Sequence, residues 1–526
     1  MGAHSENSRR IVKNTLMLYV RMLVLMLIGF YTSRVVLGAL GESDYGVYNV
    51  IGGVVAMFTV ISGALNSAIS RFITFELGKD DGNGEDKSIS RASQLNKVYS
   101  TAVLIQAAIA LIVAAVAEPV GIWFINNEMT IAPDRIPAAT WVLHFSLLSF
   151  VINLLSVPQM ASITAHERMS AYAYIGLLDG FLRLMVAFLI LRAPFDRLIS
   201  YAALMAVVVL IVRIAYGVYC RRNFEECRFR PVFDARLVRE MFSFAGWNFI
   251  GVSSGVLRDH GGNILVNLFF GPAMNAARGV AMQVFTALQG FVTNFMTAVN
   301  PQITKSYAAG DYDYLFALIR KSSKMSFYLL FVIALPVLFN TEYLLGIWLK
   351  DVPQGTVLFA QLFLIFALSE SLSNPMITAM LATGRIRNYQ IIVGGIQLMN
   401  VPVSYVLLKA GASAQSTVAV AIMISQICFF VRLYLLKRET GYGAVEHIKK
   451  VYFNVLMVSA VALVLPLAVS GLTAASPADT AAGAFARFLL SAAVAVLSAG
   501  VSVLYIGCTK DERQDIYTYL RKLIRK

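Results

Sequence analysis

The chain has 526 residues, of which 58% are apolar and only 14% are charged. Soluble domains average about half apolar and about a quarter charged residues, so this composition excludes an ordinary soluble globular protein. The formal net charge of +14 would suit a nucleic-acid-binding protein, but an excess of Lys and Arg on the inner loops of a membrane protein gives the same sum. The second interpretation is favoured, and no nucleic-acid partner is predicted.

Apolar stretches of about 20 residues recur along the whole chain, and each is long enough to cross a hydrocarbon core of about 30 Å. We therefore expect an all-α polytopic membrane protein with about 14 transmembrane helices. The expected spans are residues 11–38, 45–76, 97–125, 138–163, 170–192, 198–219, 237–268, 277–308, 322–348, 355–383, 389–409, 414–437, 449–471 and 483–508.

The cations are distributed unevenly between the two sides of this topology. The loops that follow odd-numbered spans carry few of them, namely Arg135, Arg192, Arg197, Arg278, Lys350 and Lys409. The other loops and both ends carry most of the rest, which predicts cytoplasmic termini by the positive-inside rule. In the tail, Ile516, Leu520 and Leu523 share one helical face, so residues 509–526 are expected to lie along the inner leaflet as a basic amphipathic helix.

The two halves of the chain share spaced features that indicate an internal duplication. The matched residues are Pro158, Arg168 and Tyr172 in the first half, Pro375, Arg385 and Tyr389 in the second, and the turn glycines Gly41 and Gly271. Duplicated halves of this kind are typical of transporters. We predict two pseudo-symmetric six-helix bundles at residues 1–219 and 240–437, joined by a basic cytoplasmic linker at 220–239. Two further helices follow at 438–508.

Polar side chains recur at helical spacing in three of the expected spans. The members singled out as candidate cavity-lining residues are Asn66, Asn263, Asn267, Thr293, Thr297 and Asn300. Weakly polar residues also mediate close helix packing in membranes, so packing remains the alternative for each stripe. For the long stripes that contain Asn and Gln, a water-filled cavity is the favoured interpretation.

Charged residues deep in the spans are the strongest functional signal, because the bilayer interior tolerates them only where they face protein or water. Arg21, Arg34 and Arg258 lie deep, whereas Arg213 and Arg432 lie near span ends and are expected to reach the interface. Arg258 is followed by Asp259 and His260. Adjacent helical positions point about 100° apart, so these three cannot all face one partner. A cavity lined by Arg favours an anionic group such as a phosphate.

The deep acids Asp179, Asp259 and Glu370 are candidates for coupling an ion to transport. Two alternatives stay open: Asp179 can pair with Arg183 one helical turn later, and Glu370 can accept hydrogen bonds from neighbouring hydroxyls. No catalytic set emerges, no histidine or cysteine has metal-ligand spacing, and no metal or cofactor is predicted.

Three segments carry a family resemblance: residues 13–54 (KNTLMLYVRMLVLMLIGFYTSRVVLGALGESDYGVYNVIGGV), 269–284 (FFGPAMNAARGVAMQV) and 298–311 (AVNPQITKSYAAGD). The chain resembles bacterial O-antigen and polysaccharide flippases of the multidrug/oligosaccharidyl-lipid/polysaccharide (MOP) superfamily. This resemblance implies transport of undecaprenyl-diphosphate-linked oligosaccharide across a bacterial inner membrane. It also implies a cationic cleft lined by the first, second, seventh and eighth spans, to which Arg21, Arg34, Arg258 and His260 would belong. The implied partners are the lipid-linked oligosaccharide, membrane lipid and polysaccharide assembly proteins.

Three other functions are weighed against this one. A cation or drug antiporter of the multidrug and toxin extrusion type usually relies on membrane acids in its first or seventh span, and Asp259 keeps that alternative open. A membrane-embedded glycan polymerase or acyltransferase would show a sizeable external loop or a catalytic histidine motif, and neither is present in the sequence. A scaffold within an assembly complex would need no site at all.

Overall fold

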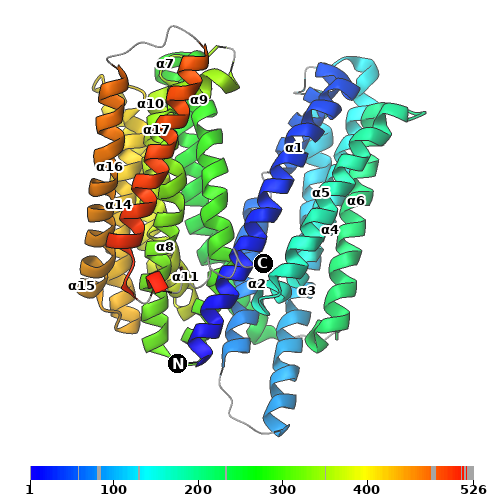
Figure 1. The fold of residues 1–526 in the computed structure, drawn as a ribbon. Coiled ribbons are helices and arrows are strands. Elements are labelled where there is room, and N and C mark those ends of the chain that lie inside the picture. Colours follow the sequence, from blue (N-terminus) through cyan, green and yellow to red (C-terminus); the bar gives the residue numbers. More distant parts are fainter. Residues whose placement is uncertain are drawn as a thin grey trace. The chain divides into compact units, whose positions relative to one another are not determined.

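The computed structural model of this chain describes residues 2–56, 59–79, 85–127, 129, 131–230, 234–349, 351–474, 481–510, 512–514 and 517. Every regular element within these residues is helical, in agreement with the predicted all-α class. The helices form two compact units by their internal contacts. Unit 1 comprises Met1–Ser253 and Thr297–Gly310, and unit 2 comprises Ser254–Met296 and Asp311–Lys526. Figure 1 shows the course of the individual helices.

Unit 1 contains six helices and the two ends of a seventh. The helices are α1 (Gly2–Ala56), α2 (Thr59–Gly78), α3 (Glu85–Asn127), α4 (Ile136–Ala165), α5 (Met169–Leu189), α6 (Arg197–Asn223) and, in part, α7 (Ala235–Ala308). The central helix is α4, which packs against α6, α3, α2 and α1. Its buried residues follow one face from Ala138 to Leu154 and occupy nearly all sides from Ser156 to Ala165, so the end of α4 is the most enclosed part of the helix.

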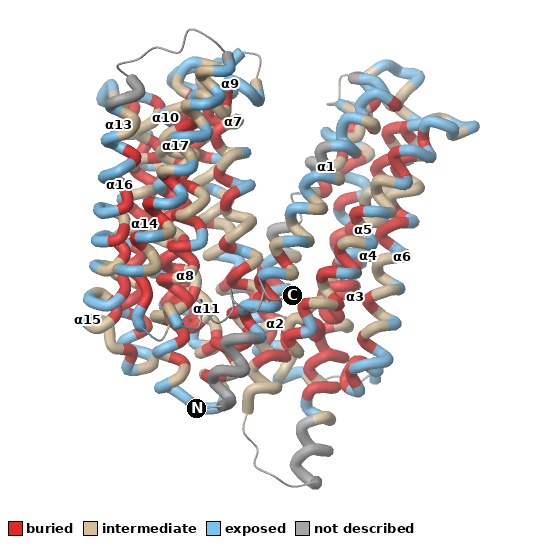
Figure 2. Tube along the Cα trace, viewed as in Figure 1, coloured by how far each residue is buried: buried red, intermediate tan, exposed pale blue. Residues whose placement is uncertain are grey.

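Unit 2 contains the middle of α7 and all later helices. These are α8 (Tyr312–Phe339), α9 (Thr341–Trp348), α10 (Thr356–Ser371), α11 (Asn374–Thr383), α12 (Arg387–Leu398), α13 (Asn400–Lys409), α14 (Ser416–Thr440), α15 (Ala444–His447), α16 (Phe453–Ala474) and α17 (Ala481–Ser502). In this unit α14 packs against α10, α11, α12 and α13, while α17 packs against α8 and α16. Figure 2 shows the resulting buried stretches along α8 and α14.

Ten helices among the described residues are long and apolar enough to cross a membrane, or eleven when the bent pair α10–α11 counts as one span. The predicted count of 14 is therefore not confirmed. The three predicted spans without a counterpart are 45–76, 237–268 and 277–308. The last two lie in the helix α7 but have too low a mean hydropathy, and the first includes residues outside those that the structure describes. In α7 the residues of the polar stripes that suggested a cavity also lower the mean hydropathy.

The two longest helices are kinked at matching glycines. Gly41 in α1 has φ 79° and ψ 169°, and Gly271 in α7 has φ 81° and ψ −178°. A positive φ places both in a region that residues with a side chain rarely adopt. Two glycines in nearly the same non-helical conformation, at positions paired by the sequence comparison, support the predicted duplication.

The turns after Pro158 and Pro375 also correspond. Glu167 has φ 58° and Gly384 has φ 74°, and each directly precedes the matched arginine. The prolines themselves differ, because Pro158 lies inside the continuous helix α4, whereas Pro375 begins α11 after a bend of 41° from α10. The two corresponding turns are thus built on Gly384 in the second half of the chain and on Glu167 in the first.

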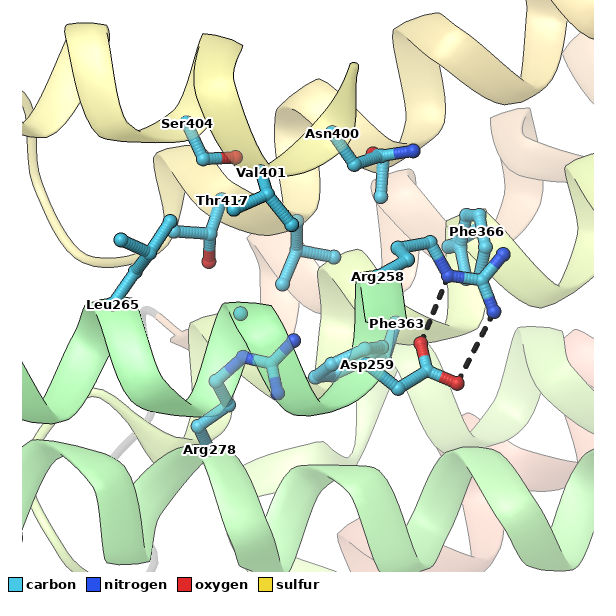
Figure 3. A pocket seen from close by; sticks show the side chains of 13 residues that line it. Arg258, Asp259, Leu265, Arg278, Phe363, Phe366, Asn400, Val401, Ser404 and Thr417 are labelled. Atoms are coloured by element: carbon cyan, nitrogen blue, oxygen red, sulfur yellow. Dashed lines mark hydrogen bonds and ion pairs between the residues drawn. The ribbon is translucent and has the colours of Figure 1, made fainter. Parts of the chain in front are cut away.

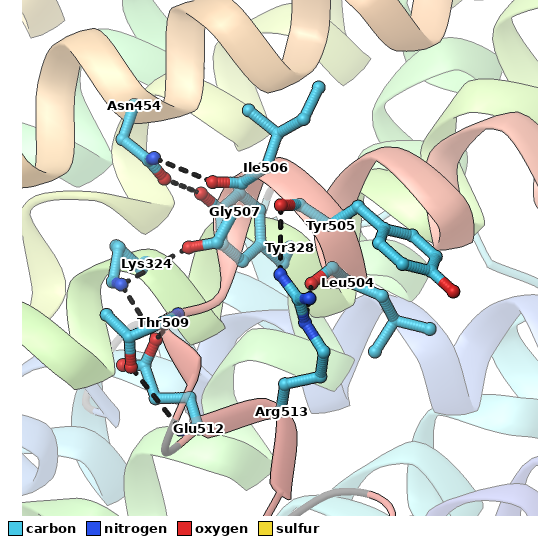
Figure 4. A network of polar contacts seen from close by, with 10 residues as sticks. All are labelled: Lys324, Tyr328, Asn454, Leu504, Tyr505, Ile506, Gly507, Thr509, Glu512 and Arg513. Carbon is cyan, nitrogen blue, oxygen red and sulfur yellow. Dashed lines mark hydrogen bonds and ion pairs between the residues drawn. The ribbon is translucent and has the colours of Figure 1, made fainter.

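A polar network ends the last long helix (Figure 4). The helix is followed by a π-helical turn, Val503–Gly507. Within this turn the Ile506 carbonyl accepts a hydrogen bond from Asn454 of α16 at 3.0 Å. After it, the Glu512 carboxylate forms an ion pair with Lys324 of α8, with Nζ and Oε2 3.0 Å apart. Burial raises the pKa of Glu512, but the Thr509 amide and Lys324 together hold it below its usual range. The π-helical turn is thereby bound to α16, and the chain beyond Gly507 is bound to α8. Most of the predicted amphipathic tail, including Ile516 and Leu520, lies outside the described residues.

Replacing Gly271 with alanine tests whether its backbone conformation matters. A Cβ at this position would meet no atom within 4 Å, so the cost comes from φ alone. We expect Gly271→Ala to lower the free energy of unfolding by about 1–2 kcal/mol, measured by thermal unfolding in detergent. Gly279→Ala is the control, since Gly279 is equally uncrowded and has helical φ. Equal stability of the two variants would contradict the assignment of strain to Gly271.

Candidate functional site

The candidate site is a pocket in unit 2, formed by α7, α10, α13 and α14 (Figure 3). Its cavity volume is about 10 Å³, which is room for about one water molecule. The residues that line it are Arg258, Asp259, Gly262, Leu265, Arg278, Phe363, Phe366, Asn400, Val401, Ser404, Thr417, Val418 and Ala421. The lining therefore combines two guanidinium groups, one carboxylate, several hydroxyl and amide groups, and aromatic rings.

Helix α7 supplies both arginines of the pocket, on opposite sides of its kink. In a straight α-helix, residues 258 and 278 would stand about 30 Å apart along the axis. The non-helical backbone at Gly271 redirects the helix, so the two guanidinium groups enter the same pocket. The kink glycine is thus the local feature of the sequence that creates the site.

Arg258 is paired with its neighbour in the chain. Its Nε donates to Oδ1 of Asp259 at 2.8 Å and its Nη2 donates to Oδ2 at 3.2 Å. The guanidinium carbon also lies 4.8 Å from the centre of the Phe366 ring. The pair is largely enclosed, since the side chain of Arg258 is 15% exposed. An anionic ligand that binds Arg258 must therefore replace the Asp259 carboxylate or share the guanidinium with it.

Arg278 is the more deeply buried cation, with 4% of the residue exposed. Its Nη1 donates to Oδ1 of Asn263 at 2.5 Å, and its guanidinium carbon lies 5.3 Å from the Phe363 ring centre. Its Nε is buried and has no hydrogen-bond partner. Gly262 makes this arrangement possible, because a Cβ there would lie 2.4 Å from Nη2 of Arg278. One donor of a buried cation thus remains unused in the pocket.

The other residues of α7 that were predicted to line a cavity lie outside this pocket. His260 and Asn267 are exposed, and neither lines the pocket. Thr293 is exposed and donates to the Gln289 carbonyl at 2.9 Å. Thr297 and Asn300 are half-buried and belong to the part of α7 that packs in unit 1. The predicted polar stripe is continuous in sequence but is divided between the two units.

The predicted cationic residues of unit 1 do not line the pocket. Arg21 lies with its guanidinium carbon 4.6 Å from the Tyr172 ring centre and packs on Gly176 of α5, where a Cβ would lie 2.2 Å from its Nε. Arg34 and Asn66 are exposed on α1 and α2. The role of these three residues in substrate binding stays a prediction.

The two other deep acids have protein partners. Asp179 accepts a hydrogen bond from Nε of Arg183 at 2.9 Å, so the intrahelical ion pair considered from the sequence is present. Glu370 accepts a hydrogen bond from Ser425 at 2.6 Å and lies 4.0 Å from Nη1 of Arg432. The prediction that Arg432 reaches the membrane interface is wrong. Arg432 is 2% exposed, because it turns into the interior of unit 2 toward Glu370.

Sequence reasoning missed Arg278 as a site residue and counted it among the outer-loop cations. The structure places it inside α7, in the segment 269–284 that carries the family resemblance. Its position seven residues after the kink glycine was the available signal. Among the described residues, no group of three His, Cys, Asp or Glu side chains is placed to hold a metal ion.

Comparisons with known proteins address the class of this molecule. The chain is similar to a solved structure of MATE in the bent conformation, with 11% identity, a TM-score of 0.69 and coverage of 83% of this chain and 97% of that one. It is similar to an outward-facing multidrug resistance MATE family transporter of the MOP superfamily (10% identity, TM-score 0.64, coverage 82% and 96%). A MOP superfamily transporter from Pyrococcus furiosus, described as having a binding pocket of reversed polarity, matches with 11% identity, a TM-score of 0.69 and coverage of 83% and 96%.

The fold is therefore that of the MATE-type transporters of the MOP superfamily, which are multi-pass membrane proteins. A search of curated proteins finds no match. A family profile described as "Polysaccharide biosynthesis protein" matches residues 11–307, which is more than half of the chain. The chain belongs to this polysaccharide biosynthesis protein family. The resemblance to the polysaccharide branch of the MOP superfamily is thereby confirmed.

Asn263 and Asn267 offer a matched test of the site, because they lie one turn apart on α7. Asn263→Ala removes a hydrogen bond to a buried cation and should lower the free energy of unfolding by about 1.5–3 kcal/mol. Asn267→Ala removes an exposed side chain and should change it by less than about 0.5 kcal/mol. Thermal unfolding in detergent measures both. An Asn263→Ala variant as stable as Asn267→Ala would show that Arg278 does not depend on this contact.

Proposed function

We propose that this protein is a flippase that moves lipid-linked oligosaccharides, specifically undecaprenyl-diphosphate-linked repeat units of a surface polysaccharide, across a bacterial inner membrane. It works by alternating access, with both termini in the cytoplasm. Membership of the polysaccharide biosynthesis protein family and the MATE-type fold support a transporter in a glycan pathway. The chemistry of the pocket supports the substrate class.

The observation that carries the proposal is the pair of guanidinium groups in one pocket. A guanidinium stays protonated and its donors match the spacing of phosphate oxygens, so two of them suit a diphosphate. Arg278 has a buried Nε without a partner, which a phosphate oxygen would satisfy. The pocket must widen to admit the head group, since its present volume holds about one water molecule.

Neutral groups beside the arginines suit the sugars that follow the diphosphate. Asn400 has a buried Oδ1 without a partner, while Ser404 and Thr417 add hydroxyl groups to the same wall. Phe363 and Phe366 present aromatic faces.

A charged, hydrated head group cannot cross hydrocarbon unaided because its desolvation costs too much. The polyprenyl tail has no such barrier and would stay in the lipid.

The rival transporter function is cation or drug antiport of the multidrug and toxin extrusion type. The fold is shared with such transporters, and Asp259 supplies an acid in α7. One fold hosts pockets of different polarity, so the fold alone does not select between the two substrates. The second arginine favours an anion, because Asp259 can neutralise only one of the two cations.

Substitution of the arginines separates these functions. Arg258→Ala and Arg278→Ala should each lower glycan translocation at least tenfold, since a charge-assisted hydrogen bond is worth about 1.5–3 kcal/mol and about 1.4 kcal/mol is a factor of ten. The assay follows labelled undecaprenyl-diphosphate oligosaccharide in proteoliposomes. Arg385→Ala, which removes an exposed arginine of unit 2, should leave the rate unchanged.

Three outcomes would contradict the proposal. Normal translocation with reduced efflux of a cationic dye would favour the antiporter. A covalent glycan product would identify an enzyme. Full activity of the Arg258→Ala/Arg278→Ala double variant would leave the pocket without a role in transport.

Of the three candidate coupling acids, Asp259 is the best placed, because it already neutralises a cation of the pocket. A proton or metal cation that binds Asp259 would release Arg258 for the diphosphate. Asp179 is paired on α5 outside the pocket and Glu370 faces Arg432, so neither competes with this ligand.

Replacing Asp259 tests this coupling. Asp259→Asn should bind a diphosphate probe more tightly and should lose the dependence of translocation on an imposed proton or sodium gradient. Asp179→Asn, which removes an acid outside the pocket, should keep that dependence. An Asp259→Asn variant with an unchanged gradient response would refute the assignment.

A further inference from the structure

The turn between α4 and α5 contains Glu167, the one non-glycine residue with positive φ among the described residues. Its φ of 58° lies in the left-handed region, where the matched turn of the second half uses Gly384. Residues with a side chain adopt this region at a cost, and such strain persists where the surroundings hold it in place.

The carboxylate of Glu167 is almost fully enclosed, with 1% of the side chain exposed, and three donors surround it. Nε of Arg10, at the start of α1, lies 2.9 Å from Oε2. From the last turns of α7, Nε2 of Gln302 donates to Oε2 at 2.6 Å and Nζ of Lys305 donates to Oε1 at 2.7 Å. Asn14 adds a long bond of 3.4 Å to the Glu167 carbonyl. One carboxylate thus joins the ends of α1 and α7 to the α4–α5 turn.

The same end of α7 has a second contact that involves no charge. Gly78 at the end of α2 lies so close to α7 that a Cβ would be 2.5 Å from the Lys305 Cα. Phe75 of α2 also faces Tyr307, with ring centres 6.3 Å apart. Lys305 therefore lies between the backbone of α2 and the Glu167 carboxylate, and only the second contact depends on charge.

The turn itself is held from its other side. His166 Nε2 contacts Oε1 of Glu226 in the linker at 2.5 Å, and its ring stacks on Phe224 at 4.2 Å. Burial raises the pKa of Glu226, but the hydrogen bond and charge of His166 lower it below its usual range. The linker thus fixes the turn, so the contact between Glu167 and α7 is the one that can open without unfolding the turn.

Helix α7 is divided between the two units at residues 296 and 297, with Thr297–Gly310 packed in unit 1. We propose that the cluster of Glu167, Arg10, Gln302 and Lys305 is a releasable latch that holds this end of α7 on unit 1 and opens during the transport cycle. The side chain of Glu167 is 1% exposed, whereas that of Arg10 is 49% and that of Lys305 is 25% exposed. A buried carboxylate is costly without its partners, so the latch holds while they are in place and can open only as water reaches the carboxylate. The release step rests on the proposed function, whereas the holding step does not.

The holding step is tested by hydrogen–deuterium exchange of the full chain in detergent, without substrate. Glu167→Gln removes the charge, and Glu167→Gly removes the carboxylate in a turn that glycine suits, as in the matched copy. Both variants should exchange at least tenfold faster over 299–308. Glu446→Gln is the matched control, because Glu446 pairs with Arg320 and Lys450 in unit 2. Unchanged exchange over 299–308, or a uniform rise throughout unit 1, would overturn the latch.

Exchanging the charges of Glu167 and Lys305 provides a rescue test for the same contact. Glu167→Lys alone should release the helix end, and Glu167→Lys combined with Lys305→Glu should restore slow exchange, since the new carboxylate can pair with both Arg10 and the new lysine. Failure of this double variant to recover protection beyond that of Glu167→Lys would contradict an ionic latch.

The release step is tested with a Glu167→Cys/Lys305→Cys variant and a reducible bis-thiol cross-linker. Cross-linking should stop glycan translocation in proteoliposomes, and reduction should restore it. Each single variant should translocate glycan at the same rate with and without the cross-linker. Translocation at the uncross-linked rate would disprove release. If the unmodified chain itself moves no glycan, the proposed function fails, and the exchange experiment still decides whether the latch holds α7.

Discussion

The cost of removing charge from water is the constraint on which this structure depends. Guanidinium groups within apolar helices must be paired or stacked, because an isolated buried charge is far more costly than a paired one. Arg258 meets this need with Asp259, and Arg278 meets it with Asn263 and Phe363. Each of these partners therefore stabilises a buried cation of the pocket.

Two glycines of α7, Gly271 and Gly262, allow Arg258 and Arg278 to line the same pocket. The kink at Gly271 brings two arginines from distant parts of one helix into a single pocket, and Gly262 leaves room for the deeper one. The matching kink at Gly41 in α1 follows from the same backbone conformation. The turn after α4 differs from its counterpart, because Glu167 stands in place of glycine and its carboxylate contacts α1 and α7.

Much of the pocket could be predicted from the sequence because buried charge is conspicuous in an apolar chain. Arg258, Asp259 and Asn263 stood out by composition and helical spacing, and all three contribute to the site or its support. Arg278 and Arg432 were misjudged for one reason. Both lie close to the ends of apolar stretches, and distance along the chain does not reveal whether a long side chain turns toward solvent or toward a neighbouring helix. The two predicted spans within α7 also have too low a mean hydropathy to qualify as membrane-crossing helices, because they carry polar residues at helical spacing.

The sequence by itself determined the class of this protein: all-helical, membrane-embedded and bearing arginine within its spans. The length, composition and helical spacing of apolar stretches are local properties. They suffice to identify membrane-spanning helices, because the backbone polar groups of a segment in the bilayer must be hydrogen-bonded internally. Only the tertiary structure decided which charges face one another, that one helix serves both units, and that the carboxylate of Glu167 gathers donors from α1 and α7. Such pairings join residues far apart in the chain, and their energy depends on distance and burial, which no local pattern encodes.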